Sequence, residues 1–259
     1  MDGEGREATY FVKSAEKTLA VLLAFSASQP RLSVTQVAQA TDLTRAAARR
    51  FLLTLVDLGY LVTDGSTFEL TPRVLDFGAG FLAGLDLPKA AHPHLQALAH
   101  GLDESATLSV LDGDEVVYIA RVAAPRLHSV TVNIGRRLPA WATSMGRVLI
   151  SALPDDAREA LLARVSITPF TDHTITSEAQ LRDEIARVGE QGWSFVSQEL
   201  DEGLRGLAVP VRRGHEVLAA LNVSVHASHL RGASVGDELV PALEAAASAI
   251  ASDYGGHSG

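Results

Sequence analysis

Hydrophobic positions in the first 60 residues recur at helical spacing in three short segments. Leucines at positions 19, 22 and 23 predict a first helix with Ser14 as its N-cap. A second, short helix is predicted to begin at Ser33, which forms an S-x-x-Q capping box with Gln36. After a connection at 41–43, a third helix is predicted, capped by Thr44, with apolar residues spaced i, i+3, i+4, i+7 and i+8 over 48–56. The connection is so short that the second and third helices must be set at an angle.

The opposite face of the third predicted helix is basic, and a hairpin follows it. Arg45 and Arg49 lie four positions apart with Arg50 beside them, and no acidic residue occurs over 43–56. Residues 60–62 and 67–70 predict two strands around the turn dipeptide Asp64-Gly65. Three helices and a hairpin are typical of a winged helix-turn-helix, in which the third helix enters the major groove of DNA. The alternative is an ordinary small helical domain with a solvated arginine face.

The pattern changes after residue 72. Apolar spacing predicts a linker helix over 73–88 and a further helix over 95–102. Strands are predicted at 108–111, 116–120, 129–134, 193–196, 207–211 and 217–225, and helices at 144–153, 155–162, 177–191 and 235–254. Antiparallel hairpins mixed with helices, without a repeating strand-helix-strand unit, predict the α+β fold class for this second domain.

Composition narrows the class of protein. The 259 residues are 47% hydrophobic and contain no cysteine, which excludes disulfides, thiolate metal sites and cysteine nucleophiles. No apolar run approaches the roughly 18 residues of a membrane span, and the polar start lacks a secretory signal, so we expect a cytoplasmic protein with no membrane partner. The net charge is −9, but the first 75 residues hold eight basic and eight acidic side chains. The acidity therefore falls on the second domain, and a local basic face remains available for nucleic acid.

The third helix offers groups for both base and phosphate contacts. Arg45 and Arg49 can pair with guanine O6 and N7, and Ala46 can contact a thymine methyl. Thr44 and Gln36 are better suited to phosphate oxygens, which set position along the DNA but not sequence.

Arg50 can serve in either role, although a solvated surface arginine is the plain alternative. One helix with three arginines supplies too little contact to choose a site within a genome. We therefore expect a homodimer or a dimer of dimers on double-stranded operator DNA.

The second domain carries polar residues that suit a small-molecule pocket. Asn222 and Ser224 share one face of an otherwise apolar strand, where the alternative is the solvated face of a half-buried sheet. Ser144-Met145-Gly146 begins a helix, whose free backbone N–H groups favour a carboxylate. Arg121 at the end of a strand is a candidate counter-charge, or else an ordinary surface residue.

Three motifs resemble cofactor-binding, catalytic or metal-binding sites, but the sequence around each one argues against that function. A G-x-G-x-x-A match at 78–83 has helical sequence on both sides, whereas a dinucleotide site needs a strand before it. A G-x-S-x-G match at 232–236 is followed by only 23 residues, and Ser234 is better explained as a cap of the last helix. The cluster of His92, His94 and His100 includes a proline and makes an unconvincing metal site. We expect no catalytic residue, no metal and no cofactor.

Three stretches resemble the IclR family of bacterial transcriptional regulators, and the resemblance extends over nearly the whole chain. They are T-R-A-A-A-R-R-F-L-L-T-L at 44–55 with L-G-Y at 58–60, G-R-R-L-P-A-W-A-T-S-M-G-R at 135–147, and Q-E-L-D-E-G-L-R-G-L-A-V-P at 198–210. The resemblance implies a winged helix-turn-helix (1–72), a linker helix (73–88) and a GAF-like α/β effector-binding domain (89–259). It also implies effector contacts from Ser144, Met145, Gly146, Leu204, Asn222 and Ser224.

Within the family, the first two stretches most resemble the branch of PcaR, PcaU and PobR. That branch implies control of aromatic-acid catabolism by a small effector, an aromatic or dicarboxylic acid such as protocatechuate, 4-hydroxybenzoate or β-ketoadipate. The alternative function is a GAF-like small-molecule-binding protein without specific DNA readout.

Overall fold

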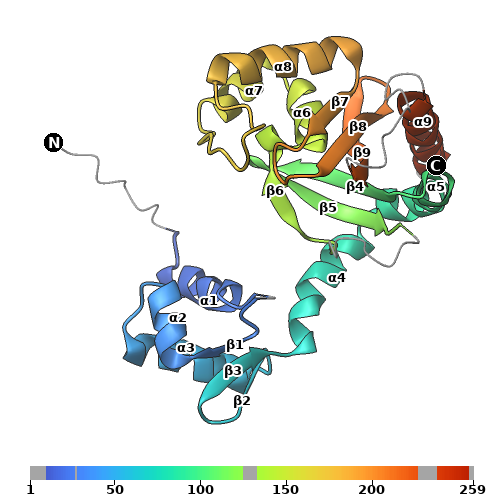
Figure 1. The fold of residues 1–259 in the computed structure, drawn as a ribbon. Helices are drawn as coiled ribbons and strands as arrows, with labels where there is room; N and C mark the ends of the chain where they lie inside the picture. The colour runs from blue at the N-terminus through green and yellow to red at the C-terminus, as the bar shows by residue number, and fades with distance from the viewer. Residues whose placement is uncertain (1–9, 27, 125–132, 227–237, 257–259) are drawn as a thin grey trace. The chain divides into compact units, whose positions relative to one another are not determined.

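The chain forms two units, Met1–Gly84 and Leu85–Gly259, in a computed structural model that describes residues 10–26, 28–124, 133–226 and 238–256 (Figure 1). The first unit contains α1 (Lys13–Leu23), β1 (Arg31–Ser33), α2 (Val34–Ala40), α3 (Arg45–Asp57), β2 (Leu61–Thr63) and β3 (Thr67–Leu70). Its three strands form an antiparallel sheet in the order β1-β3-β2. This is the predicted winged helix-turn-helix, with β1 as an additional strand that three residues were too few to predict.

The predicted helix starts are confirmed in two of three cases. The capping box of Ser33 and Gln36 is present, and the Ala47 N–H donates to Thr44 Oγ1 at 3.2 Å. The prediction of Ser14 as the first N-cap is wrong, because α1 begins at Lys13 and its N-cap is Val12, two residues earlier, with no side-chain cap. Apolar spacing defines the buried face of a helix and says little about its first residue.

The predicted single helix over 73–88 is divided in the structure. A short 3₁₀ turn, η1 (Pro72–Val74), leads into α4 (Leu75–Ala83), and α5 (Asp86–Leu102) begins after a break at Gly84. The G-x-G-x-x-A match lies inside α4, so the rejection of a dinucleotide site is confirmed. The helix predicted over 95–102 is only the second half of α5, which begins at Asp86 and continues through Pro93.

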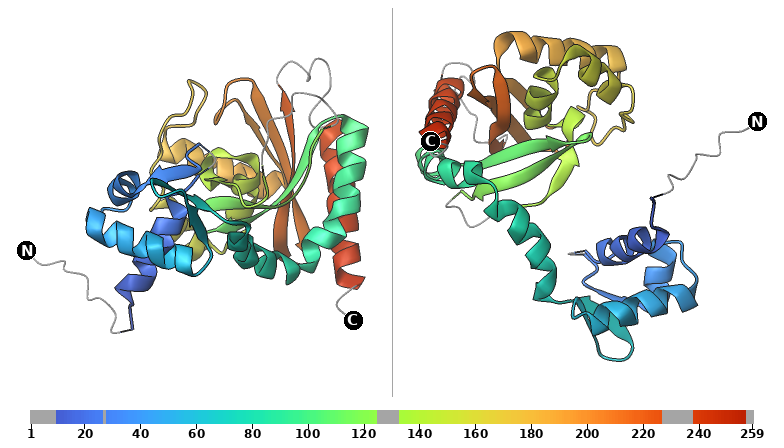
Figure 2. Two further views of the ribbon diagram at one scale, coloured as in Figure 1. Left: turned by 90° about the horizontal axis from the view of Figure 1, so that it is seen from below. Right: turned by 180° about the vertical axis from the view of Figure 1, so that it is seen from behind.

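The second unit is a six-stranded antiparallel sheet with helices on both faces, which confirms the α+β prediction (Figure 2). Its strands follow the order β6-β5-β4-β9-β8-β7. Their bounds are β4 (Ser105–Asp112), β5 (Glu115–Val122), β6 (Arg137–Pro139), β7 (Ser194–Ser197), β8 (Leu204–Arg213) and β9 (Glu216–His226). The helices are α5, η2 (Ala140–Ala142), α6 (Ser144–Ser151), α7 (Asp155–Leu162), α8 (Glu178–Gln191) and α9 (Val240–Gly256).

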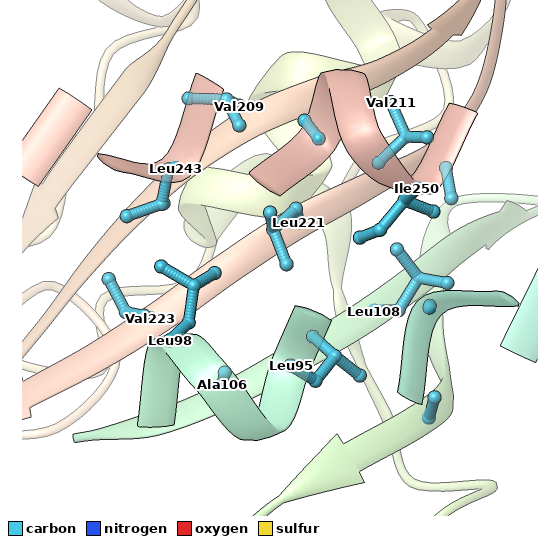
Figure 3. Close-up of a cluster of buried hydrophobic side chains, with 14 of the residues drawn as sticks. Leu95, Leu98, Ala106, Leu108, Val209, Val211, Leu221, Val223, Leu243 and Ile250 are labelled. Atoms are coloured by element: carbon cyan, nitrogen blue, oxygen red, sulfur yellow. The ribbon is translucent and has the colours of Figure 1, made fainter. Parts of the chain in front are cut away.

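Helices α5 and α9 lie side by side on one face of this sheet, and α6 covers the other (Figures 1 and 2). Under α5 and α9, leucines 95, 98, 108, 221 and 243 pack with valines from β8 and β9 (Figure 3). Each fully buried leucine contributes about 1.5–3 kcal/mol. The α6 face has its own cluster, which includes Trp141, Met145 and Ile185. Residues of β8 and β9 alternate between the two clusters, so each strand has one face toward α6 and one toward α5 and α9.

Two predictions for the second unit fall wholly or mostly on residues that the structure does not describe. The strand predicted at 129–134 lies mostly outside them, and the strand that the structure shows nearby is β6. The G-x-S-x-G match, Ser234 and the predicted start of the last helix at 235 also lie outside them. None of the described helices is both long and apolar enough to cross a membrane.

Candidate functional site

The exposed side of α3 is a basic surface made by Arg45, Arg49 and Arg50. All three side chains are exposed, as is Ala46 between them. No guanidinium of the three forms a hydrogen bond or ion pair with another described residue. On the buried side, Ala48, Leu52 and Leu55 anchor the helix to the rest of the first unit. The arginines are thus held on a packed helix with their charges uncompensated by the described part of the chain.

The residues predicted to touch phosphate are partly engaged in helix capping. Gln36 is exposed, and its Oε1 accepts hydrogen bonds from the Ser33 N–H at 2.9 Å and the Ser33 hydroxyl at 2.8 Å. Its amide N–H groups remain available as donors. Thr44 Oγ1 accepts from the α3 backbone, so its hydroxyl proton can still point to a phosphate.

The turn between β2 and β3 is held by one carboxylate. Asp64 accepts hydrogen bonds from the Thr67 and Ser66 backbone N–H groups at 2.7 and 2.8 Å and from both hydroxyls. The backbone N–H of Thr67, then that of Ser66, holds the pKa of Asp64 well below its usual range. The turn between β2 and β3 is therefore anionic and is held by four hydrogen bonds to one carboxylate.

In the second unit, Asn222 and Ser144 meet at the α6 face of the sheet. Asn222 lies in β9 and is 1% exposed. Its Nδ2 donates to Ser144 Oγ at 3.0 Å and to the Leu207 carbonyl at 2.9 Å, and its Oδ1 accepts from the Ser224 hydroxyl at 3.1 Å. The alternative of a solvated sheet face is wrong for Asn222, because α6 covers it.

A pocket opens beside this network, between α6 and the sheet. The empty space between them measures about 390 Å³ when its solvent-filled mouth is counted. Five of the predicted effector residues line it: Ser144, Met145, Leu204, Asn222 and Ser224. The other lining residues are Tyr118, Leu138, Ala142, Thr143, Val196, Glu199, Leu200, Asp201, Arg205 and Gly206.

Gly146 belongs to the packing of α6 and does not line the pocket. A Cβ on Gly146 would lie 2.0 Å from the Ala140 carbonyl oxygen, so this glycine lets α6 pack directly on η2. Gly206 has a related role in the pocket wall, where a Cβ would lie 2.8 Å from Ser144 Oγ. The position of the Ser144 hydroxyl therefore depends on both glycines, because a side chain at either would displace α6 or the hydroxyl itself.

The N-terminus of α6 supplies unused hydrogen-bond donors to the pocket. Thr143 is the N-cap, and its Oγ1 accepts from the Gly146 N–H at 3.1 Å. The N–H groups of Ser144 and Met145 have no acceptor among the described residues. Because Asn222 donates to Ser144 Oγ, the Ser144 proton is also free to donate. Three donors at a helix N-terminus suit a carboxylate.

Arg121 lies on the pocket face but not in the pocket. Cross-strand pairing aligns Arg121 with Thr107 in β4, and Thr107 with Asn222 in β9, so the three share one face of the sheet. Its Nη2 donates to Ser105 Oγ at 3.3 Å. The predicted counter-charge is absent from the pocket lining. Burial raises the pKa of Tyr118, and the charges of Arg136 and Arg121 oppose that rise.

A buried ion pair behind the pocket was missed by the prediction. Arg147 is 1% exposed and makes two hydrogen bonds to Glu199, at 2.9 and 2.7 Å, and a third to the Trp141 carbonyl at 2.9 Å. Glu199 also accepts from the Ile175 N–H at 3.1 Å, and its carbonyl accepts from the Thr174 hydroxyl at 2.6 Å. The pair joins α6 to the segment of the pocket wall at 199–201. Both residues lie in stretches quoted above, Arg147 in 135–147 and Glu199 in 198–210, but nothing in their spacing pairs them.

The histidine cluster is dispersed in the structure. His94 Nε2 lies 2.8 Å from Asp253 Oδ2, and His100 Nδ1 lies 2.8 Å from the Gln96 carbonyl oxygen. Within the described part of the chain, no group of three or more potential ligands could hold a metal ion.

Comparison with protein-family models gives two matches that together span most of the chain. Residues 14–65 match the IclR helix-turn-helix domain, and residues 79–252 match the bacterial transcriptional regulator IclR C-terminal domain. The Pca regulon regulatory protein of Pseudomonas putida is 40% identical over 91% of this chain and 82% of its own length. The p-hydroxybenzoate hydroxylase transcriptional activator of Acinetobacter baylyi is 36% identical over 90% of this chain and 88% of its own length.

Solved structures show the same fold. A crystal structure from Rhodococcus sp. RHA1 is 44% identical, with a TM-score of 0.83 over 95% of this chain and 100% of that chain. An IclR homolog from Microbacterium hydrocarbonoxydans, crystallised in complex with 4-hydroxybenzoate, is 23% identical, with a TM-score of 0.80 over 93% of this chain and 98% of that chain.

Proposed function

This chain belongs to the IclR family of bacterial transcriptional regulators, and on that premise we propose that it controls genes of aromatic-acid catabolism in response to a small aromatic carboxylate. The family unites a helix-turn-helix DNA-binding domain with an effector domain, and its members are regulators and not enzymes. Beyond family membership, we propose that the protein binds a specific operator sequence, that an aromatic carboxylate binds its second unit, and that the two binding events are coupled.

The proposal of an aromatic carboxylate as effector is supported by the pocket itself, which has hydrogen-bond donors at one end and apolar walls. One end presents the Ser144 hydroxyl and the unused N–H groups of Ser144 and Met145, which suit a carboxylate. Apolar side chains complete the walls and suit a flat ring: Leu138, Ala142, Val196, Leu200 and Leu204. The names of the Pca and p-hydroxybenzoate regulators, and the 4-hydroxybenzoate in the Microbacterium homolog, support the same class.

The DNA half of the proposal rests on the exposed arginines of α3. We propose that Arg45 and Arg49 contact base edges, that Ala46 faces a thymine methyl, and that Thr44 and Gln36 contact phosphate. Arg50 adds a phosphate or base contact.

A homodimer or dimer of dimers would double these contacts on a symmetric operator. Several large apolar side chains of the first unit are exposed, which supports a surface for a second copy. They are Leu19 and Leu23 on α1, and Leu75, Phe77 and Phe81 on α4.

The coupling is thermodynamic linkage. An effector that binds preferentially to one of two states of the protein, with different operator affinities, changes operator affinity by its differential binding free energy. Effector and operator must then each alter the affinity for the other by the same factor.

The function is tested by fluorescence anisotropy on DNA from upstream of the gene itself and from neighbouring intergenic regions. Protein is titrated at two salt concentrations, with and without protocatechuate, 4-hydroxybenzoate or β-ketoadipate. Selective binding that one acid changes supports the proposal. Selective binding with no response would remove the effector class, and no preference over scrambled DNA would favour a small-molecule-binding protein without specific DNA readout.

Replacing Ser144 with alanine should weaken effector binding about tenfold or more, because a hydrogen bond to a charged group contributes about 1.5–3 kcal/mol. Isothermal titration of the full-length protein measures the change in Kd. The matched control is Ser151→Ala at the other end of α6, where the hydroxyl donates only to the Val148 carbonyl at 2.9 Å. Equal Kd values for the Ser144→Ala variant and the wild type would remove the carboxylate from this end of the pocket.

A further inference from the structure

Tyr118 contributes a second polar group to the pocket, on a different strand from Asn222. It lies in β5, is 5% exposed as a residue, and lines the pocket together with Ser144. Its backbone is fixed by two hydrogen bonds to the segment just before β6: its N–H donates to the Arg136 carbonyl at 3.1 Å, and its carbonyl accepts from the Gly135 N–H at 2.8 Å. The side chain therefore enters the pocket from a rigid part of the sheet.

The Tyr118 hydroxyl is an unused hydrogen-bonding group. It makes no hydrogen bond with any described residue. It is not sealed in the core either, because the fully enclosed side-chain atoms without a partner, among the described residues, are Ser109 Oγ, Ser194 Oγ and Arg205 Nε. A tyrosine with a buried ring normally finds a partner for its hydroxyl. An opening onto the pocket explains how this one remains unpartnered.

Arg205 is a weaker candidate for ligand contact, although it lines the pocket. It neighbours Gly206, whose Cβ position faces Ser144 and Asn222, and successive residues of a strand point to opposite faces. The Arg205 side chain therefore leaves the sheet on the side of α5 and α9. Tyr118 on β5 and the start of α6 supply hydrogen-bond donors to the pocket lining, which also contains Glu199, Asp201 and Ser224.

The spacing of these two groups selects the shape of the ligand. Asn222 ties Ser144 to β9, and β4 lies between β9 and β5, so the two strands are about 9.6 Å apart. Tyr118 also aligns, through Ser109, with Ala220, two residues along β9 from Asn222, which lengthens the gap. A benzoate with an oxygen at the para position, with one hydrogen bond at each end, spans such a gap. An ortho oxygen would lie beside the carboxylate and could not reach Tyr118.

We propose that Tyr118 is a specificity-determining residue that hydrogen-bonds a ring hydroxyl para to the carboxylate of the effector, so that 4-hydroxybenzoate-type acids are preferred over benzoate. The inference rests on the proposed function, because it assumes that the pocket binds an aromatic carboxylate. Burial raises the pKa of Tyr118, opposed by the charges of Arg136 and Arg121, so the phenol is protonated at neutral pH and can donate or accept.

The test compares Kd values of full-length protein for 4-hydroxybenzoate, 2-hydroxybenzoate, 4-methylbenzoate and benzoate by isothermal titration. Wild type should bind 4-hydroxybenzoate about tenfold more tightly than the other three. Tyr118→Phe should lose most of that preference by weakening 4-hydroxybenzoate about tenfold, with benzoate changed less than about twofold. Tyr60→Phe is the matched control, because Tyr60 stacks on Phe77 in the first unit.

The outcomes separate this inference from the proposed function. If wild type binds neither 4-hydroxybenzoate nor benzoate, the effector class and the role of Tyr118 are both overturned. If it binds 4-hydroxybenzoate and 4-methylbenzoate equally, only the role of Tyr118 is overturned, without the need of a variant. A Tyr118→Phe protein that retains the preference, or that loses affinity for all four acids equally, also overturns it, since the second result indicates a packing role.

Discussion

Replacing Arg147 with methionine is expected to lower the free energy of unfolding by about 3–5 kcal/mol, because it leaves a buried carboxylate without its cation. Glu199 is 8% exposed on its side chain and receives two hydrogen bonds from Arg147. The remaining donor to its carboxylate is the Ile175 N–H at 3.1 Å. Such a loss is a large fraction of the roughly 5–15 kcal/mol that keeps a typical domain folded.

Urea denaturation followed by circular dichroism measures this loss. The control is Arg213→Met, because the Arg213–Glu216 pair is 48% and 63% exposed and contributes less than about 1 kcal/mol. The double variant Arg147→Met/Glu199→Leu should recover part of the loss, since removing both charges removes the desolvation cost. Similar stabilities for wild type and Arg147→Met would show that water reaches Glu199 and compensates its charge.

The ion pair also has a consequence for the pocket. Glu199, Leu200 and Asp201 form part of its wall, and Arg147 on α6 holds Glu199 in place. We expect Arg147→Met to weaken effector binding even at temperatures where it remains folded, because the wall residues lose their attachment to α6.

Replacing Arg49 with alanine is expected to abolish operator selectivity while leaving the protein folded. A bidentate arginine–guanine contact contributes about 1–3 kcal/mol, and a symmetric dimer loses it in both half-sites, so the total is about 2–6 kcal/mol. Stability should be unaffected, because Arg49 is exposed and makes no hydrogen bond or ion pair within the described part of the chain.

The measurement is the ratio of Kd values for operator and scrambled DNA at two salt concentrations. Arg31→Ala is the matched control, because it removes one positive charge from the same unit, where Arg31 pairs with Glu69 at 2.9 Å on β3. If Arg49 contacts a phosphate instead, its removal would weaken binding to operator and scrambled DNA alike and reduce the salt dependence of binding. An unchanged selectivity ratio in Arg49→Ala would refute α3 as the recognition helix.

Local sequence rules predicted elements that depend on neighbours along the chain. The capping box of Ser33 and Gln36, the cap of Thr44 and the hairpin at Asp64 are all present, because their hydrogen bonds join residues two or three positions apart. The same rules placed the start of the next helix at residue 95, whereas α5 begins at Asp86 and continues through Pro93. Packing of Leu87, Ala91 and Leu95 against the sheet outweighs the loss of one backbone hydrogen bond.

The candidate site could be predicted only in outline. The resemblance and the polar spacing of Asn222 and Ser224 led to five residues that line the pocket. They did not lead to Tyr118 or to Glu199, the resemblance placed Gly146 at the ligand, and the position of Arg121 at the end of a strand suggested it as a counter-charge. Arg121 does not line the pocket, and Gly146 is needed for the close approach of α6 to η2.

The sequence by itself determined the winged helix, the basic face of α3 and the α+β class of the second unit, because these follow from spacing and charge within short segments. Only the tertiary structure decided which side chains meet. Ser144 and Asn222 are 78 positions apart, and Arg147 and Glu199 are 52 apart. Contacts at such separations depend on the strand order β6-β5-β4-β9-β8-β7 and on how α6 packs across it, and local periodicity carries no information about either.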